Sequence, residues 1–216
     1  MKKRDFVVRF AGEGGQGVVT SAEGLAQAAA QVGYHVQTFA TFPSQIKGGP
    51  TWTQTRLSST VVLSSGDELD VLVAFNEDAY QSHKQEMAPG GVVIYNSAEF
   101  TITDEGTSFG MDFAELAKAT GNPRSANFVV MGSLSRLVDM PIGVFEDFNL
   151  KRYTRGRPTD KQIIDSNNAA LHLGWEEAEK SGLSLGALTD PVKPEYEQIL
   201  VNGNITIGLG AMACWS

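Results

Sequence analysis

The clearest chemical signal in the sequence lies between positions 12 and 17. The segment Gly12-Glu13-Gly14-Gly15-Gln16-Gly17 places Gly12, Gly14 and Gly17 at the spacing G-x-G-x-x-G. Glycine lets the backbone approach a ligand closely, and the N–H groups that begin a helix attract anions. The pattern is typical of a loop that cradles a phosphate or pyrophosphate. The simplest alternative is a tight strand-to-helix turn that binds nothing.

Two familiar nucleotide sites are disfavoured by the residues around this loop. A dinucleotide site expects an acidic residue about 20 positions further on to hold the ribose, but no Asp or Glu occurs between Gly24 and Asp67. An ATP-hydrolysing P-loop needs a lysine just before the helix, and Gly17-Val18-Val19-Thr20 has none. A stand-alone Rossmann-like nucleotide-binding oxidoreductase remains open as an alternative.

A second loop supplies the positive charge that the first one lacks. Thr41 to Pro50 is polar and follows a predicted strand, and it contains Lys47 next to Gly48-Gly49. Loops after parallel strands meet at one edge of an α/β sheet. We therefore expect both loops to face one crevice, with Lys47 placed to bind a phosphate. A solvated loop lysine is the alternative.

Composition limits the classes of function. The chain has 216 residues, 42% of them hydrophobic, and a formal charge of -8, which disfavours nucleic acid and anionic membranes as partners. Cys214 is the only cysteine and His35, His83 and His172 are scattered, so we expect neither a metal site nor an iron–sulfur cluster. We expect a cytoplasmic protein without a membrane span.

Hydrophobic patterning predicts the elements that position the two loops. A strand from Phe6 to Ala11, a helix from Val18 to Val32 and a strand from His35 to Ala40 form a βαβ unit, whose strands are parallel. Thr51 to Leu57 and Thr60 to Ser64 predict an antiparallel hairpin.

The rest of the chain continues the alternation of strands and helices. Further strands are predicted at 70–75 and 92–96, with a weaker one within 100–110, and helices at 77–88, 112–120, 127–138, 145–152 and 160–181. The fold class is α/β: a three-layer α/β/α domain with a mixed, mostly parallel, Rossmann-like sheet that contains an antiparallel hairpin.

The chain divides into three parts by composition. Residues 1–182 carry the predicted domain, and residues 183–198 are rich in Gly, Ser, Thr and Pro, as in a linker. Residues 199–216 open a fresh apolar stretch, which we interpret as the start of a following domain. A C-terminal helix docked on the first domain is the alternative.

Four segments in order carry a resemblance to a known family. They read FAGEGGQGVVTSAEGLAQAA, FPSQIKGGPTWTQTRLS, DVLVAFNEDA and NFVVMGSL, and Asn168-Ala169-Ala170-Leu171-x-x-Gly174 also fits. Together they resemble the gamma subunit or domain of 2-oxoacid:ferredoxin oxidoreductases, the pyruvate and 2-oxoglutarate enzymes. The tail NGNITIGLGAMACWS resembles the opening of the alpha-type, thiamine-enzyme domain in fused gamma–alpha chains of the 2-oxoglutarate type.

The resemblance implies a division of labour. Such enzymes decarboxylate a 2-oxoacid on thiamine diphosphate, pass electrons through iron–sulfur clusters to ferredoxin and deliver the acyl group to coenzyme A. Asn167-Asn168 stands without the Gly-Asp-Gly that precedes such a pair in a thiamine site. We therefore expect thiamine diphosphate and the clusters in alpha- and beta-type partners. This chain would be inactive alone, have no catalytic residue, and belong to a complex that could itself dimerise.

The resemblance also implies which residues bind coenzyme A. They are Gly14, Gly15, Gln16, Gly17, Lys47 and Asn127. Some pyruvate-type members have two adjacent lysines where this chain has Gln45 and Ile46, which makes Lys47 the least secure of the six. A ligand-free assembly domain is the second alternative to this assignment.

One basic cluster stands out from the acidic background. Lys151-Arg152 and Arg155-Gly156-Arg157 lie within seven positions of each other. The cluster is either a solvated surface or a contact with coenzyme A phosphates or an acidic neighbouring subunit.

Overall fold

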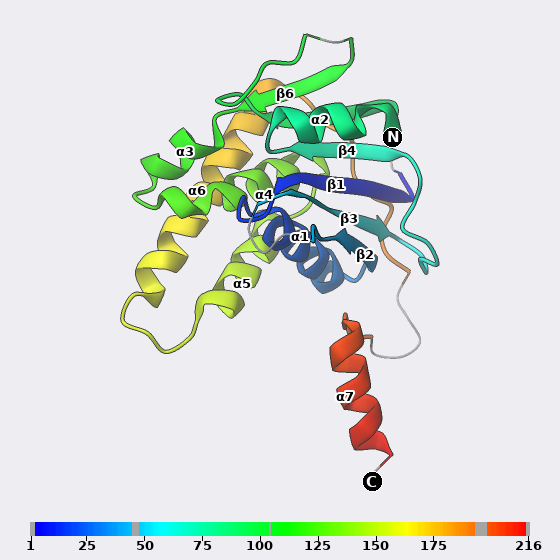
Figure 1. The fold of residues 1–216 in the computed structure, drawn as a ribbon. Helices are drawn as coiled ribbons and strands as arrows, with labels where there is room; N and C mark the ends of the chain where they lie inside the picture. The colour runs from blue at the N-terminus through cyan, green and yellow to red at the C-terminus, as the bar shows by residue number, and fades with distance from the viewer. Residues whose placement is uncertain (1–2, 45–47, 104, 193–197, 215–216) are drawn as a thin grey trace.

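The computed structural model describes residues 3–44, 48–103, 105–192 and 198–214. Figure 1 shows the elements, which follow one another as β1 (Asp5–Glu13), α1 (Val18–Val32), β2 (His35–Thr41), β3 (Pro50–Ser58), β4 (Leu69–Ala74), α2 (Glu77–His83), η1 (Lys84–Glu86), β5 (Met87–Asn96), β6 (Thr107–Met111), α3 (Phe113–Ala119), η2 (Pro123–Ser125), α4 (Ala126–Leu137), α5 (Ile142–Tyr153), α6 (Asp160–Ser181) and α7 (Gly203–Ala213).

The strands form one six-stranded sheet in the order β2-β3-β1-β4-β5-β6. The strands β1, β4, β5 and β6 are parallel to one another. β3 is antiparallel to both of its neighbours, β1 and β2. This mixed, mostly parallel sheet confirms the predicted fold class.

The antiparallel hairpin lies one strand earlier than predicted. The sequence predicted pairing of Thr51–Leu57 with Thr60–Ser64, and this was wrong, because residues 60–64 form no strand. β2 and β3 form the hairpin instead, and β3 lies between β2 and β1. Since β1 and β2 occupy both edges of β3, no edge remains for residues 60–64. The first two strands point the same way, as predicted, but are not neighbours.

One helix is shorter than predicted. The sequence predicted a helix at 77–88, whereas α2 ends at His83 and β5 already begins at Met87. The register between β4 and β5 shifts at Leu69/Val71, where Gly90 has a φ of 80°. A bulge thus carries extended backbone through a Pro-Gly-Gly segment that would otherwise interrupt a strand.

Alternating side chains of β1 contribute to two cores, one on each face of the sheet. Phe6, Val8 and Phe10 are buried in the larger core, which includes α1, α4, α5 and α6. Val7 and Ala11 belong to the smaller core, which includes α2. In Figure 1 these helices form the two outer layers around the sheet.

The two helices α4 and α6 cross at unusually close range. A Cβ atom added to Gly132 would overlap the carbonyl oxygen of Leu171, and one added to Gly174 would overlap that of Val129. The two glycines therefore let the helix backbones touch. This crossing fixes the beginning of α4, which contains Asn127, against the rest of the helical layer.

The C-terminal part separates into two different segments. Leu188 forms a parallel bridge with Lys3, and the Leu185 N–H donates to the Leu137 carbonyl, so residues near 183–189 pack back on the domain. Helix α7 stands apart in Figure 1, and its residues are exposed. The boundaries proposed at 183 and 199 stay predictions.

Candidate functional site

The turn from β1 into α1 requires glycine at two positions. Gly15 has a φ of 102°, and Gly17, which precedes the first residue of α1, has a φ of 94°. These values lie in the left-handed region, where a Cβ atom is costly. A Cβ atom on Gly15 would meet nothing within 4 Å, so this glycine borders open space.

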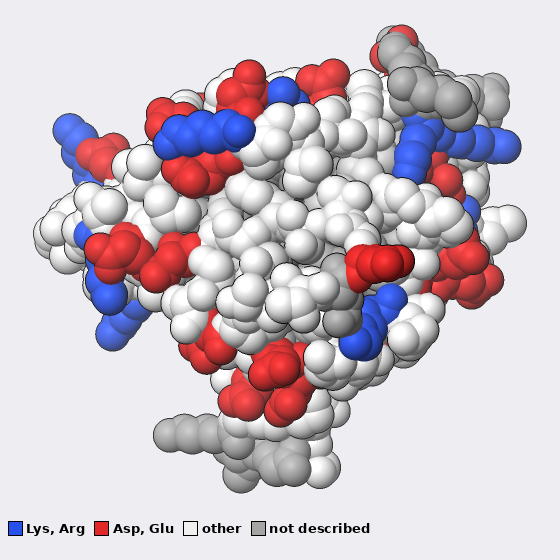
Figure 2. All heavy atoms as spheres, turned by 90° about the horizontal axis from the view of Figure 1, so that it is seen from above, with Lys and Arg blue, Asp and Glu red and all other residues white. Residues whose placement is uncertain are grey.

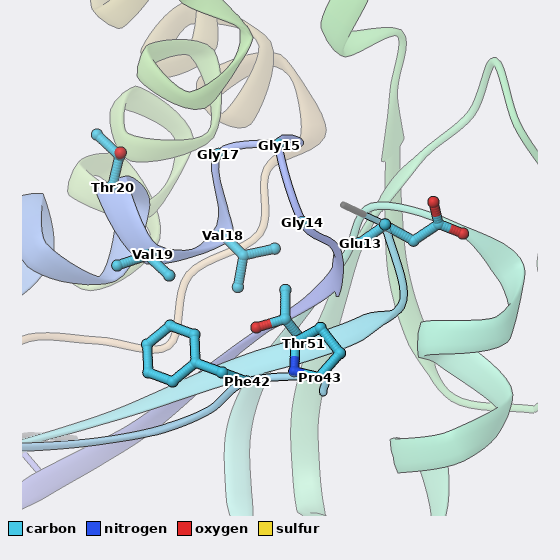
Figure 3. Close-up of a pocket in the computed structure, with 11 residues that line it drawn as sticks. Glu13, Gly14, Gly15, Gly17, Val18, Val19, Thr20, Phe42, Pro43 and Thr51 are labelled. Atoms are coloured by element: carbon cyan, nitrogen blue, oxygen red, sulfur yellow. The ribbon is translucent and has the colours of Figure 1, made fainter. Parts of the chain in front are cut away.

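The two glycine-containing loops border one pocket, as the sequence predicted. The Gly14 N–H donates to the Gly49 carbonyl oxygen at 3.3 Å, which joins the loops directly. The pocket has a volume of about 700 Å³, and Figure 3 shows its lining. The described residues around it are Glu13, Gly14, Gly15, Gly17, Val18, Val19, Thr20, Phe42, Pro43, Gly48 and Thr51.

The first turn of α1 gives this pocket an affinity for anions. Val18, Val19 and Thr20 line the pocket, and the N–H groups of a first helical turn have no acceptor within the helix. No acidic side chain occupies that turn. The positive end of the helix dipole thus faces the pocket. Among the described lining residues Glu13 alone is ionisable, so backbone amides would carry the recognition of an anion.

Gln16 turns back onto its own loop instead of lining the pocket. Its side-chain Oε1 accepts the Glu13 N–H at 2.7 Å and lies 3.5 Å from the Nδ2 of Asn76. Asn76 in turn caps α2 by accepting the Ala79 N–H at 2.9 Å. The structure therefore links the glycine loop to the first turn of α2 through two amide side chains, those of Gln16 and Asn76.

Asn127 lies behind the glycine loop. It is buried, and a Cβ atom on Gly17 would lie 2.9 Å from the Cβ of Asn127. Gly17 is thus required both by its φ angle and by the closeness of α4. Of the six predicted residues, the structure brings Gly14, Gly15, Gln16, Gly17 and Asn127 together, but it places neither Gln16 nor Asn127 in the pocket lining.

Lys47 lies outside the described residues, so its predicted contact stays a prediction. Sequence reasoning missed three residues of the pocket lining: Phe42 and Pro43, which provide apolar surface, and Thr51. It also missed the role of Asn76. A signal was available, because these residues fall within the matched segments FPSQIKGGPTWTQTRLS and DVLVAFNEDA.

A second cavity adjoins the site on the α2 side of the sheet. It has a volume of about 470 Å³ and shares Glu13 and Thr51 with the first pocket. Trp52 lines it, and the Arg9 guanidinium lies 4.4 Å from the Trp52 ring.

Arg9 is the centre of a buried network beside this cavity. It donates to Gln54, to Glu86 at 2.5 Å and to the Nδ1 of His83 at 2.9 Å. Partial burial alone would raise the pKa of Glu86, but hydrogen bonds from Arg9 and His83 outweigh it, and the pKa lies below its ordinary value. All three nitrogens of the Arg9 guanidinium donate within this network, which therefore supports β1 and β3 structurally.

The described residues contain no cluster of three or more His, Cys, Asp or Glu side chains suited to a metal ion. In the same part of the chain, no helix is both long and apolar enough to cross a membrane.

Comparisons with known proteins identify the fold's relatives. The family model for pyruvate ferredoxin/flavodoxin oxidoreductase matches residues 7–177. Ketoisovalerate oxidoreductase subunit VorA from Methanothermobacter marburgensis is 31% identical over 184 residues, covering 82% of this chain and 37% of VorA. Pyruvate synthase subunit PorC from Thermotoga maritima is 26% identical over 189 residues, covering 83% of this chain and 97% of PorC.

One solved structure matches nearly the whole chain. It is the 2-oxoglutarate:ferredoxin oxidoreductase from Magnetococcus marinus with 2-oxoglutarate, coenzyme A and succinyl-CoA bound. The TM-score is 0.86 at 30% identity, and the match covers 98% of this chain and 37% of that one. The chain therefore spans little more than a third of that structure and of VorA. The family match covers most of the chain, which belongs to the pyruvate ferredoxin/flavodoxin oxidoreductase family.

Proposed function

We propose that this chain is the gamma-type domain of a 2-oxoacid:ferredoxin oxidoreductase, with 2-oxoglutarate as the favoured substrate, and that it binds coenzyme A and holds the assembly together. One observation carries the proposal: two loops joined by the Gly14–Gly49 hydrogen bond border a pocket of about 700 Å³ at the positive end of α1. A solved relative with coenzyme A bound supports the choice of ligand.

The pocket suits the two chemical parts of coenzyme A. The backbone amides at Gly15 and Gly17 and in the first turn of α1 would hold phosphate oxygens, while the Gly14 amide joins the two loops. Lys47 would add a charge-assisted contact to the same phosphates. Phe42 and Pro43 provide apolar surface for the less polar part of the molecule.

Gln16 and Asn127 would act on the loop itself. Gln16 holds the Glu13 amide, and Asn127 packs on Gly17. Both would keep the cradle in one conformation before the ligand arrives, which lowers the entropic cost of binding.

The reaction itself would take place on other segments or polypeptides. Coenzyme A supplies a thiol that accepts the acyl group, and this domain would position the nucleotide part so that the thiol reaches the reacting centre. Thiamine diphosphate and the iron–sulfur clusters would lie in alpha- and beta-type partners, with ferredoxin as electron acceptor. Residues 199–216 would open the following alpha-type domain, in a cytoplasmic complex that would itself dimerise.

Calorimetric titration of the complete oxidoreductase with coenzyme A and, separately, with NADH tests the proposal. We expect saturable binding of one coenzyme A per gamma-type domain and no heat from NADH. Saturable NADH binding without coenzyme A binding would favour a stand-alone nucleotide-dependent oxidoreductase. The absence of binding for both ligands would leave only an assembly role.

A further inference from the structure

Positive charge is concentrated where α5 turns into α6. Between positions 151 and 161 there are five basic side chains and one carboxylate, whereas the whole chain has a formal charge of -8. The basic residues are Lys151, Arg152, Arg155, Arg157 and Lys161, which we call the basic tip. In Figure 1 this turn lies at the ends of α5 and α6 that point away from the sheet.

The turn is held in a defined conformation by its single carboxylate. Asp160 accepts the backbone N–H of Arg155 at 2.6 Å and that of Arg157 at 3.0 Å. The Asp160 N–H donates back to the Arg157 carbonyl at 3.1 Å. These N–H groups, that of Arg157 foremost, lower the pKa of Asp160, so the carboxylate stays ionised and the turn stays closed. A binding surface on a closed turn loses little conformational entropy on contact.

In the part of the chain that the structure describes, only two of the five basic side chains of the basic tip bond to side chains of other helices in the domain. Arg152 forms an ion pair with Glu23 of α1 at 2.8 Å. Lys151 donates to the neutral Gln31 side chain at 3.3 Å, and Gln31 itself bonds to Asp147. These contacts hold the end of α5 against α1.

The remaining cations point outward. The Arg155 Nε donates to the Arg152 carbonyl, and its guanidinium lies 5.4 Å from the Tyr153 ring. Within the described residues neither Arg155, Arg157 nor Lys161 forms a side-chain ion pair, although Arg157 attracts Asp160 electrostatically. All three are exposed.

On one face of the molecule, charged side chains of both signs are mixed. Figure 2 shows the face seen from above, with positive and negative side chains scattered in small groups around a broad uncharged area. The basic tip differs because one sign predominates over a short, rigid segment. A cluster of this kind steers and orients an oppositely charged partner.

We propose that the basic tip docks on an acidic surface of another polypeptide in the same assembly. Arg155 and Arg157 have planar donor groups suited to carboxylate pairs, and Leu150 in the last turn of α5 is 51% exposed and offers apolar surface. An extended nucleic acid would meet repulsion from a chain of charge -8.

A phosphate of the bound nucleotide is the less favoured occupant. None of the five basic residues is among the described residues that line the glycine-loop pocket. The proposal depends on the proposed function only in that the partner is a polypeptide of the same oxidoreductase.

Zero-length carbodiimide cross-linking of the complete complex, followed by mass spectrometry, identifies the partner surface. We expect amide links from Lys161 or Lys151 to Asp or Glu residues of another chain or domain. Links from these lysines only to carboxylates of residues 1–192 would overturn the proposal.

Salt-dependent dissociation of the same complex, followed by native mass spectrometry, gives the second readout. The double variant Arg155→Gln/Arg157→Gln should lower the NaCl concentration for half-dissociation by about a factor of two, because rim charges are screened by salt. The control Lys118→Gln/Lys180→Gln removes the same charge from exposed helix surfaces. An equal effect in both variants, or none in either, would contradict docking through the tip.

Coenzyme A titration of these variants separates the two proposals. Weakened coenzyme A binding with unchanged dissociation would show that the tip holds a phosphate, and docking would be wrong. Failure of the unaltered complex to bind coenzyme A, with the salt effect intact, would overturn the proposed ligand but not the docking surface.

Discussion

The Gly14 N–H donates to the Gly49 carbonyl oxygen at 3.3 Å, and the position of β3 explains why. β3 pairs with β1 so that Pro50 lies opposite Glu13. The end of β1 and the beginning of β3 therefore meet at one edge of the sheet. In a simple βαβ arrangement β2 would lie beside β1. The inserted antiparallel strand is what brings the second loop onto the first.

Gly15→Ala should weaken coenzyme A binding at least tenfold, about 1.4 kcal/mol, because it adds a methyl group to the pocket side of the cradle. The left-handed φ of 102° also adds a backbone cost of about 1–2 kcal/mol. Calorimetric titration of the complete complex measures the first effect and thermal unfolding the second.

Gly90→Ala is the matched control for that change. Gly90 has a φ of 80° and no atom within 4 Å of an added Cβ, but it lies away from the glycine loop, in β5. We expect a similar loss of stability and unchanged coenzyme A affinity. Equal affinity losses in both variants would mean that general destabilisation, not the cradle, controls binding.

The variants Gln16→Ala and Gln16→Glu should distinguish the effect of the Gln16 hydrogen bond on stability from the effect of local charge on coenzyme A binding. Alanine removes the acceptor of the Glu13 N–H and should cost about 0.5–1.5 kcal/mol of stability. The Gln16→Glu variant keeps an acceptor for the Glu13 N–H, so it should unfold at a higher temperature than Gln16→Ala. It also places a negative charge near the phosphate site, so it should bind coenzyme A more weakly than Gln16→Ala. Stronger binding by the glutamate variant would refute an anion site here.

Gly132→Ala and Gly174→Ala should each destabilise the protein by about 3 kcal/mol or more, because the added carbon would overlap a carbonyl oxygen of the opposite helix. Gly143→Ala in α5 is the control, since its added carbon meets nothing within 4 Å. We expect it to be neutral or slightly stabilising. Urea unfolding measures all three, and a mild effect at Gly132 and Gly174 would contradict the close crossing.

The Arg9 network predicts a pH dependence of stability. The pKa of Glu86 lies below its ordinary value of 4.5 in the folded protein, so the stabilisation is complete above 4.5 and disappears as the pH falls through the lower folded pKa. Glu86→Gln should therefore cost stability at pH 7, and the difference from the unaltered protein should shrink below pH 4.5.

The exposed residue Glu99 provides the control for that experiment. Glu99→Gln should change the free energy of unfolding little at either pH. A Glu86→Gln difference that grows as the pH falls would show that the network does not favour the charged carboxylate.

Much of the fold was predictable because local patterns and tertiary structure agree. Helix α1 ends at Val32 and α6 ends at Ser181, as their patterns predicted, since each is followed by a glycine in the left-handed region. The glycine loop was predictable for the same reason: its spacing determines its conformation.

The strand order was not predictable from local patterns. The Thr- and Trp-rich sequence of β3 predicts a strand but not its place in the sheet. Which strands it pairs with depends on contacts between residues far apart in the sequence. The burial of Asn127 behind Gly17 and the return of Gln16 onto Glu13 are likewise tertiary. The family resemblance implied ligand contacts for both residues, and these contacts stay predictions.

The binding of coenzyme A by the complete oxidoreductase, with and without Lys47, tests the central claim most directly. Calorimetry should show saturable binding that Lys47→Ala weakens by about 10-fold or more, the size expected for a lost charge-assisted phosphate contact. Lys118→Ala, which removes an exposed lysine from α3, should leave the affinity unchanged. Identical affinities for all three proteins, or no binding at all, would contradict the account.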